Sequence, residues 1–264
     1  MTETYYSGKK HKLPKVLNKK QLLVAMREIR SPTVMMGIFL STFLGLRVGE
    51  IAIDDRRTII PLKWENVDLE IGEVLILDAK NPKRFKSGYG KDRIVPIFDE
   101  FLHIFKMWRS LNQDSEYVLP HQNYKGKPMR VPTLQRHLQE ALEKIGLMHV
   151  EYYQNDGKPR YMYHYHTLRH VCACNLLRRG LTLEQVKEFL GHESIETTQV
   201  YIKLVKDDLK EAVTHAFAYP KKRQYFLDLK QPNFDLQVGL EALRLENENL
   251  KLKLQLQQEM VVIL

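Results

Sequence analysis

The stretch HTLRHVCACNLLRRGLTLEQVKEFLGHESIETTQVYIK, residues 166–203, organises the chain around three consecutive helical segments. The first ends at Gly180, a residue typical of helix ends because it adopts positive φ without a Cβ penalty. The second is LTLEQVKEFLGH, and the third begins after a short turn at Ile195. Apolar residues recur at helical spacing in all three segments. The sequence therefore predicts three amphipathic helices in succession.

The segments upstream of residue 166 add helices and a small sheet. A helix is expected after Asn18, and a second, TVMMGIFLSTFLGLRVGEIA, is apolar nearly all round and should be buried. Short apolar runs between Leu62 and Pro96, namely LKW, EVLILDA and RIVPI, predict strands. Helices are again expected at 100–108 and 132–145, followed by a surface loop or irregular hairpin, VEYYQNDGKPRYMYHYH. The predicted fold is mainly α with a small antiparallel β-sheet.

Positive charge is concentrated in two segments. The chain has a formal net charge of +9, and its first thirty residues carry eight Lys/Arg against two acids. KNPKRFKSGYGKDR, residues 80–93, carries six against one. A merely solvated surface usually mixes both signs, so these blocks favour contact with phosphates, and double-stranded DNA is the expected partner.

No membrane association is expected, because the sequence has neither an apolar run long enough to span a bilayer nor an apolar segment near its N-terminus. The protein should stay where it is made, in the cytoplasm. Its two cysteines, Cys172 and Cys174, stand two residues apart in an expected helix, where they point to different faces. They are interpreted as reduced thiols, and a single C-x-C pair is too little for a zinc site.

The segment 166–203 resembles, almost position for position, the second signature box of the tyrosine recombinases, the phage integrase and Xer family. The upstream LGLRVGE resembles the first box of the same family. With the sheet between them, the resemblance covers roughly residues 16–215. It implies a catalytic domain that breaks and rejoins DNA through a 3′-phosphotyrosine, as a site-specific recombinase or integrase of a virus or mobile element. This mechanism needs no cofactor and no metal.

Two arginines are the candidates for binding the scissile phosphate. Guanidinium groups bind phosphate oxygens through two parallel hydrogen bonds and stay charged at any relevant pH. Arg47 lies between the apolar runs LSTFLGL and VGEIA, where a buried charge without a partner would be costly. Glu50, three residues later, is close enough on a helix to orient it. Arg169 is the second candidate, and His166, three residues earlier, would share its helix face.

The resemblance supplies roles for three further residues. It implies that His166 takes part in proton transfer with the nucleophile and that His192 donates a hydrogen bond to the scissile phosphate. Tyr201 lies nine residues after His192 and matches the family's nucleophile. A phenol is a poor nucleophile at its ordinary pKa of about 10, so it needs neighbouring cations and a base. His164 and His170 match no motif position and are interpreted as packing or surface residues.

The family's general acid is a lysine on the sheet hairpin, which protonates the leaving 5′ oxygen. Lys80, at the end of EVLILDA, matches best, although the following loop is longer than usual, so Lys86 or Lys91 could reach the site instead. The inserted IDDRRTII after the first box is a second departure. The basic residues of the hairpin are the expected DNA contacts: Lys83, Arg84, Lys86, Lys91 and Arg93.

The C-terminal segment has a different pattern. From Leu236 to Leu264, apolar and amide residues alternate steps of four and three, the spacing of heptad a and d positions, and Asn247 stands at a presumed a position. This predicts a coiled coil that makes the protein a homo-oligomer, a dimer in solution and a tetramer on DNA. The expected organisation is a basic arm at 1–15, a catalytic domain at 16–215, a linker at 216–235 and a coiled coil at 236–264. Family members usually carry a helical domain ahead of the catalytic one, so sequence specificity is expected to be relaxed or supplied by a partner.

Two other functions stay open at this point. A type IB topoisomerase-like enzyme would nick and reseal DNA with the same residues, and supercoil relaxation by the monomer would favour it. A non-catalytic dimeric DNA-binding regulator could use the same scaffold and the zipper. Such a binder has no need of the five motif residues together: Arg47, His166, Arg169, His192 and Tyr201.

Overall fold

The computed structural model describes residues 13–54, 61–77, 92–154 and 156–205. The helices and strands in that part of the chain are α1 (Lys19–Arg27), α2 (Pro32–Phe43), α3 (Val48–Ile51), the 3₁₀ helix η1 (Trp64–Asn66), β1 (Val67–Asp68), β2 (Glu73–Ile76), β3 (Arg93–Pro96), α4 (Asp99–Leu111), α5 (Val131–Lys144), β4 (Val150–Tyr153), β5 (Pro159–Tyr161), α6 (His166–Arg178) and α7 (Leu183–Leu190). A further helix occupies residues 196–205. The predicted linker and coiled coil lie outside the described residues. The expected mainly helical fold with small antiparallel sheets is confirmed.

Local sequence explains where several helices begin. Asn18 caps α1 by accepting a hydrogen bond from the backbone N–H of Gln21, whose side chain accepts one from Asn18 in return. Thr182 forms the same reciprocal pair with Gln185 at the start of α7. Such capping boxes satisfy backbone donors that a helix start leaves unpaired. They fix the point at which each helix leaves the preceding loop.

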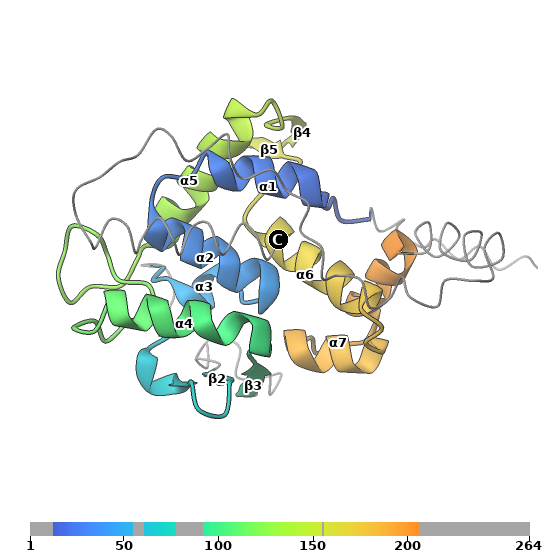
Figure 1. The fold of residues 1–264 in the computed structure, drawn as a ribbon. Coiled ribbons are helices and arrows are strands. Elements are labelled where there is room, and N and C mark those ends of the chain that lie inside the picture. Colours follow the sequence, from blue (N-terminus) through green and yellow to red (C-terminus); the bar gives the residue numbers. More distant parts are fainter. Residues whose placement is uncertain (1–12, 55–60, 78–91, 155, 206–264) are drawn as a thin grey trace, which may run out of the picture.

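Helix α2 is the centre of the core. Ten of its twelve residues, from Thr33 to Thr42, are buried, as its nearly uniform apolar sequence predicts. It packs against α6 and α5, and Figure 1 shows it in the middle of the molecule between α1, α4 and α6. The expected single helix through VGEIA is wrong in one respect. The chain leaves α2 at Phe43, turns at Gly45 with φ of 64°, and begins the separate short helix α3 at Val48.

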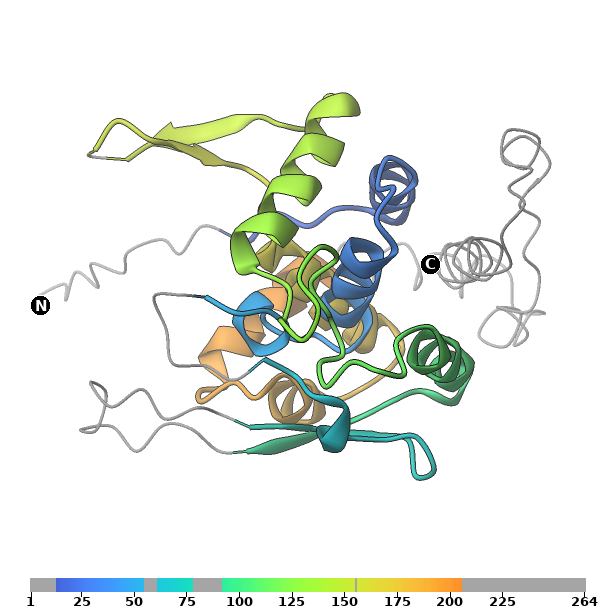
Figure 2. The same ribbon diagram turned by 90° about the vertical axis from the view of Figure 1, so that its left-hand side faces the viewer.

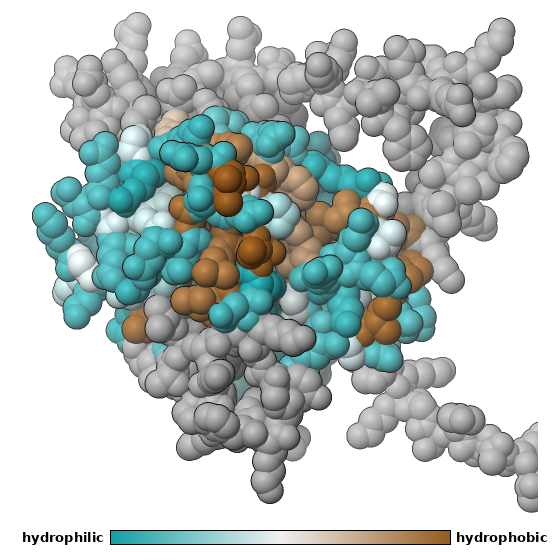
Figure 3. Space-filling view, turned by 90° about the horizontal axis from the view of Figure 1, so that it is seen from below, coloured by the Kyte–Doolittle hydropathy of each residue, from teal (hydrophilic) through white to brown (hydrophobic). Residues whose placement is uncertain are grey.

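The small sheet has the strand order β1-β2-β3, and both pairings are antiparallel. Leu75 pairs with Ile94 and Ile76 with Arg93. The expected strand LKW is wrong, because only Lys63 forms an isolated bridge, with Tyr117, before η1 begins. Figure 3, which views the molecule from the side of this sheet, shows apolar residues gathered on that face.

The segment expected to be a loop or irregular hairpin is an antiparallel pair, β4 and β5, with a register shift between Val150 and Tyr152. Figure 2 shows this hairpin extending from the body of the molecule beyond α5. Tyr152 and Tyr153 are exposed on it. None of the helices in the described ranges has the length and apolar character needed to cross a membrane.

Candidate active site

The loop between α2 and α3 places Arg47 beside α6 and α7. A Cβ on Gly45 would collide with Leu190 Cδ2 and lie 3.2 Å from Cys172 Sγ, so only glycine permits this approach. Arg47 stands at the N-cap of α3, and its guanidinium donates to the carbonyl of Gly191 at 3.1 Å. The first signature segment is thereby joined to the turn that precedes His192.

Glu50 connects two arginines. Its carboxylate accepts hydrogen bonds from the backbone N–H of Arg47 at 2.7 Å and from the Arg47 guanidinium at 2.7 Å. Arg93 donates two more, at 2.9 and 2.8 Å, in a side-by-side arrangement. Burial opposes ionisation of Glu50, but the hydrogen bond from Arg93 and the charges of Arg93, Arg47 and Arg169 outweigh it and lower its pKa to about 2. Glu50 is therefore an anion at any working pH.

Arg169 is almost fully buried, with 1% of its surface exposed. It donates to the carbonyl of Gly45 at 2.5 Å and to the carbonyl of Leu190. Burial, followed by the charge of Arg47, lowers its pKa to about 9, which leaves it a cation at neutral pH. Its Nε is buried without a hydrogen-bond partner, as is the Nε of Arg93. The cluster therefore holds more positive charge and more donors than Glu50 satisfies, which is the electrostatic character of an anion site.

His192 lies on the turn after α7. Gly191 ends that helix with φ of 65°, and a Cβ there would come within 2.7 Å of Arg93 Cδ. The Nδ1 of His192 is 2.9 Å from Thr198 Oγ1, which fixes the ring and leaves Nε2 to face other groups. Burial, then the charges of Arg169 and Arg47, lower the pKa of His192 to about 3, so the imidazole is neutral at pH 7.

Tyr201 comes from the helix at residues 196–205 and is 2% exposed. Its ring stacks on His192 with ring centroids 6.3 Å apart and an interplanar angle of 19°. Its hydroxyl is 2.8 Å from Nδ1 of His170. Burial raises the pKa of Tyr201 to about 12, although the charges of Arg169 and Arg47 act in the opposite direction. The phenol is therefore protonated in this structure.

His166 begins α6 and has an exposed side chain. Its ring meets the edge of His170, with centroids 4.8 Å apart at 89°. Burial, followed by the electrostatic effect of His170 and Arg169, lowers its pKa. His166 thus lies next to His170.

The structure places six of the motif-derived residues in one region: Arg47, Glu50, His166, Arg169, His192 and Tyr201. Five lysines and arginines of the hairpin lie outside the described residues: Lys80, Lys83, Arg84, Lys86 and Lys91. Arg93, expected at the DNA surface, uses its guanidinium to hold Glu50, and its side chain is only 10% exposed. His170 is the residue that sequence reasoning missed. A signal was present, because His166 and His170 are four residues apart and so share one helix face.

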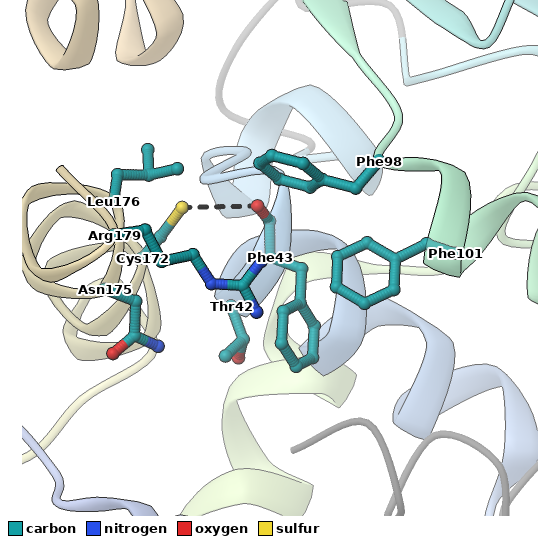
Figure 4. A pocket seen from close by; sticks show the side chains of 8 residues that line it. All are labelled: Thr42, Phe43, Phe98, Phe101, Cys172, Asn175, Leu176 and Arg179. Carbon is teal, nitrogen blue, oxygen red and sulfur yellow. Dashed lines mark hydrogen bonds between the residues drawn. The ribbon is translucent and has the colours of Figure 1, made fainter. Parts of the chain in front are cut away.

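Figure 4 shows how α6 is fixed against the end of α2. The carbonyl of Phe43 accepts a hydrogen bond from Cys172 Sγ at 3.4 Å, and Phe98 and Phe101 close the side of this shallow pocket. Cys172 and Cys174 are both free and buried. The contact between Cys172 and Phe43 holds the loop at Gly45 in a position where Arg169 donates a hydrogen bond to its backbone. In the described ranges no group of His, Cys, Asp and Glu is arranged to hold a metal ion.

Comparison with known proteins gives one family. The model of the phage integrase family matches residues 15–207. The tyrosine recombinase XerA of Pyrococcus furiosus is 29% identical over 211 residues, which are 77% of this chain and 62% of that relative. The tyrosine recombinase XerC of Halalkalibacterium halodurans is also 29% identical over 211 residues, with 76% of this chain and 61% of that relative covered. The chain thus spans about three fifths of the length of these curated relatives.

Solved structures give the same fold. The crystal structure of XerA recombinase superposes with a TM-score of 0.55 and 24% identity, covering 77% of this chain and 66% of that one. XerH site-specific recombinase in a post-cleavage complex with the palindromic difH substrate gives a TM-score of 0.52 and 25% identity. That match covers 77% of this chain and 53% of the XerH chain.

Proposed function

The chain belongs to the phage integrase family, and from this membership and the geometry of the site we propose that it breaks and rejoins double-stranded DNA through a covalent bond between Tyr201 and a 3′ phosphate. The carrying observation is the placement of the Tyr201 phenol against His170 and His192, where the charges of Arg169 and Arg47 act on it. A nucleophile, imidazoles and excess positive charge are thereby gathered at one place. That combination suits transesterification of a phosphodiester.

In the proposed reaction, the covalent phosphotyrosine conserves the energy of the broken phosphodiester bond. The oxygen of Tyr201 attacks the phosphorus, the bond to the 5′ oxygen breaks, and the resulting 5′ hydroxyl of a strand later attacks the phosphotyrosine to reseal the DNA. Arg47 and Arg169 stabilise the negative charge that grows on the nonbridging oxygens, since their cluster has donors to spare. His192 donates a hydrogen bond to the phosphate, and His166 takes part in proton transfer at the site.

Covalent capture tests this function without a defined target site. The purified protein is incubated with a library of nicked duplexes of randomised sequence, in which the cleaved 5′ fragment diffuses away and traps the intermediate. Labelled adducts that survive SDS are then isolated and sequenced. We expect adducts in which the protein is joined to the 3′ phosphate at the break, and the captured sequences should be related to one another. A yield no higher than that of a heat-denatured sample would contradict the function.

We further propose that the enzyme is the site-specific recombinase of a virus or mobile element. The sequence pattern of its two signature segments and the tyrosine recombinases among its relatives support the recombinase activity. Joining of two separate duplexes by the protein would bear out that activity. Supercoil relaxation with no exchange between duplexes would show a topoisomerase-like activity instead.

The leaving oxygen requires a proton, and we propose that Lys80 supplies it. The described strands that flank Lys80 in the sequence support this, because Ile76 pairs with Arg93 and Arg93 is bonded to Glu50 in the site. Lys80→Ala should slow cleavage of an ordinary phosphodiester by about 100-fold or more. It should leave cleavage unchanged on a substrate with sulfur at the leaving position, because a thiolate departs without protonation. If the sulfur substrate restores the cleavage rate of Lys86→Ala or Lys91→Ala, and not that of Lys80→Ala, then the restored lysine is the general acid.

The oligomeric state is the remaining part of the proposal. Recombination of two duplexes needs four protomers, and the heptad pattern from Leu236 to Leu264 supplies a means of pairing. We expect the full chain to be a dimer in solution and a version ending at Asp235 to be a folded, DNA-binding monomer. Light scattering on the two proteins measures this. Aggregation or unfolding of the shorter protein would show that the segment packs on its own domain.

A further inference from the structure

His170 is the group that the structure places on the reacting atom of the proposed nucleophile. Its Nδ1 lies 2.8 Å from the hydroxyl of Tyr201, and the two rings are 5.6 Å apart between centroids with an angle of 48°. The two residues come from α6 and from the helix at 196–205, so the contact spans thirty-one positions of sequence. The neighbouring His166 reaches the edge of His170 instead.

The protonation state of His170 favours one direction for this hydrogen bond. Burial, then the charges of His164 and Arg169, lower the pKa of His170 to about 4. The ring is therefore neutral at pH 7 and can carry its single proton on Nε2, which leaves the lone pair of Nδ1 free to accept. Because the phenol of Tyr201 is protonated, its O–H donates to Nδ1.

The other two imidazoles are less well placed for this role. The Nδ1 of His192 is engaged by Thr198, and its ring stacks on the face of Tyr201 rather than meeting its hydroxyl. His166 is exposed at the start of α6. A general base has to lie within hydrogen-bond reach of the proton that it takes. His170 meets that condition in the structure.

We propose that His170 is a catalytic residue that accepts the phenolic proton of Tyr201 during strand cleavage and returns it during resealing. The inference rests on the proposed function. In cleavage the O–H bond of Tyr201 breaks and an N–H bond forms at Nδ1 of His170, while the Tyr201 oxygen bonds to phosphorus and the 5′ oxygen leaves with a proton from the separate acid on the hairpin. In resealing the attacking 5′ hydroxyl returns its proton to that acid, and the imidazolium reprotonates the Tyr201 oxygen. No oxidant, metal or other reactant is needed.

Replacing His170 with asparagine separates proton transfer from positioning. The amide of asparagine can reach a place near that of Nδ1 and hydrogen-bond the phenol, but it cannot take a proton at neutral pH. We expect His170→Asn to slow single-turnover adduct formation by about 100-fold or more. DNA binding and the melting temperature should stay close to those of the wild type. His170→Ala should be at least as slow, and added imidazole should restore part of its rate.

Two comparisons sharpen the test. His164→Asn is the matched control, because His164 lies near the same cluster, with its ring 6.4 Å from that of His166, but does not contact Tyr201 in the structure. Its rate should stay near that of the wild type. On the substrate with sulfur at the leaving position, the loss in His170→Asn should persist, since nucleophile activation is still required. The loss in the lysine variant should disappear there.

Several outcomes would overturn the assignment while leaving the proposed function intact. Cleavage by His170→Asn within about threefold of the wild type would mean that His170 only positions the phenol. Faster cleavage by His170→Ala would mean that the hydrogen bond between His170 and Tyr201 holds the nucleophile in an unreactive position, away from DNA. A large loss in His166→Asn with a near-normal His170→Asn would return the role to His166. Failure of the wild type to form any adduct would reject the proposed function itself, and is distinguishable from all three.

Discussion

Replacing Tyr201 with phenylalanine is expected to abolish covalent capture of DNA and to leave the folded protein and its noncovalent DNA binding nearly unchanged. The substitution removes one oxygen from a ring that stays packed against His192. The lost hydrogen bond to His170 should change the free energy of unfolding by only about 1 kcal/mol. The positively charged side chains are untouched. Chemistry and binding should therefore separate completely in this variant.

The measurement is a denaturing gel of labelled nicked duplex incubated with each protein, beside a gel-shift titration and a thermal melt. Tyr163→Phe is a matched control, because Tyr163 lies just ahead of α6 and is only partly buried. It should form as much adduct as the wild type. An SDS-stable adduct in the Tyr201→Phe protein would show that another residue is the nucleophile. Loss of DNA binding together with cleavage would show that the hydroxyl has a structural role.

The sequence alone is sufficient to predict the helices that carry the second signature segment. Residues 166–203 have helical periodicity, a capping pair at Thr182 and Gln185, and glycines at the ends, and all of these signals are local. The structure has α6, α7 and the helix at 196–205 in that stretch. The strand predicted at LKW is wrong because a run of three residues cannot distinguish a strand from a 3₁₀ turn.

The site shows the same division between local and long-range information. That Glu50 orients Arg47 could be inferred from their spacing of three residues. That Arg93 also holds Glu50 could not, because the pair is separated by forty-three positions and depends on how the sheet packs. A basic residue in a basic loop is most simply interpreted as a phosphate contact, and only the tertiary structure shows that Arg93 faces inward. The contact between His170 and Tyr201 could not be predicted for the same reason.

The second large effect is expected at Glu50, where glutamine should destabilise the fold and misplace Arg47 together. The carboxylate of Glu50 accepts four hydrogen bonds from Arg47 and Arg93, so both of its oxygens face N–H donors. Glutamine has one acceptor oxygen, and its NH₂ group would face a donor. Removing one member of a buried ion pair usually costs about 3–5 kcal/mol. Cleavage should fall as well, because Arg47 loses the group that holds it towards Gly191.

Glu116→Gln is the matched control, since Glu116 pairs with Lys63 but its side chain is 56% exposed. Exposed pairs contribute little, so this variant should melt close to the wild type. Urea unfolding at neutral pH measures both. Equal stability of Glu50→Gln and the wild type would mean that Arg47 and Arg93 hold their positions without the carboxylate.

Acid supplies an independent test of the same interaction. The pKa of Glu50 falls from the ordinary value of 4.5 to about 2 on folding. A depressed pKa stabilises the folded protein fully above the unfolded value and loses that contribution as pH falls through the folded value. The wild type should therefore have a larger free energy of unfolding than Glu50→Gln above pH 4.5. This difference should shrink as the pH falls from 4.5 to 2. A gap that stays constant across this window would assign the effect of the substitution to packing rather than charge, since the shape of glutamine is the same at every pH.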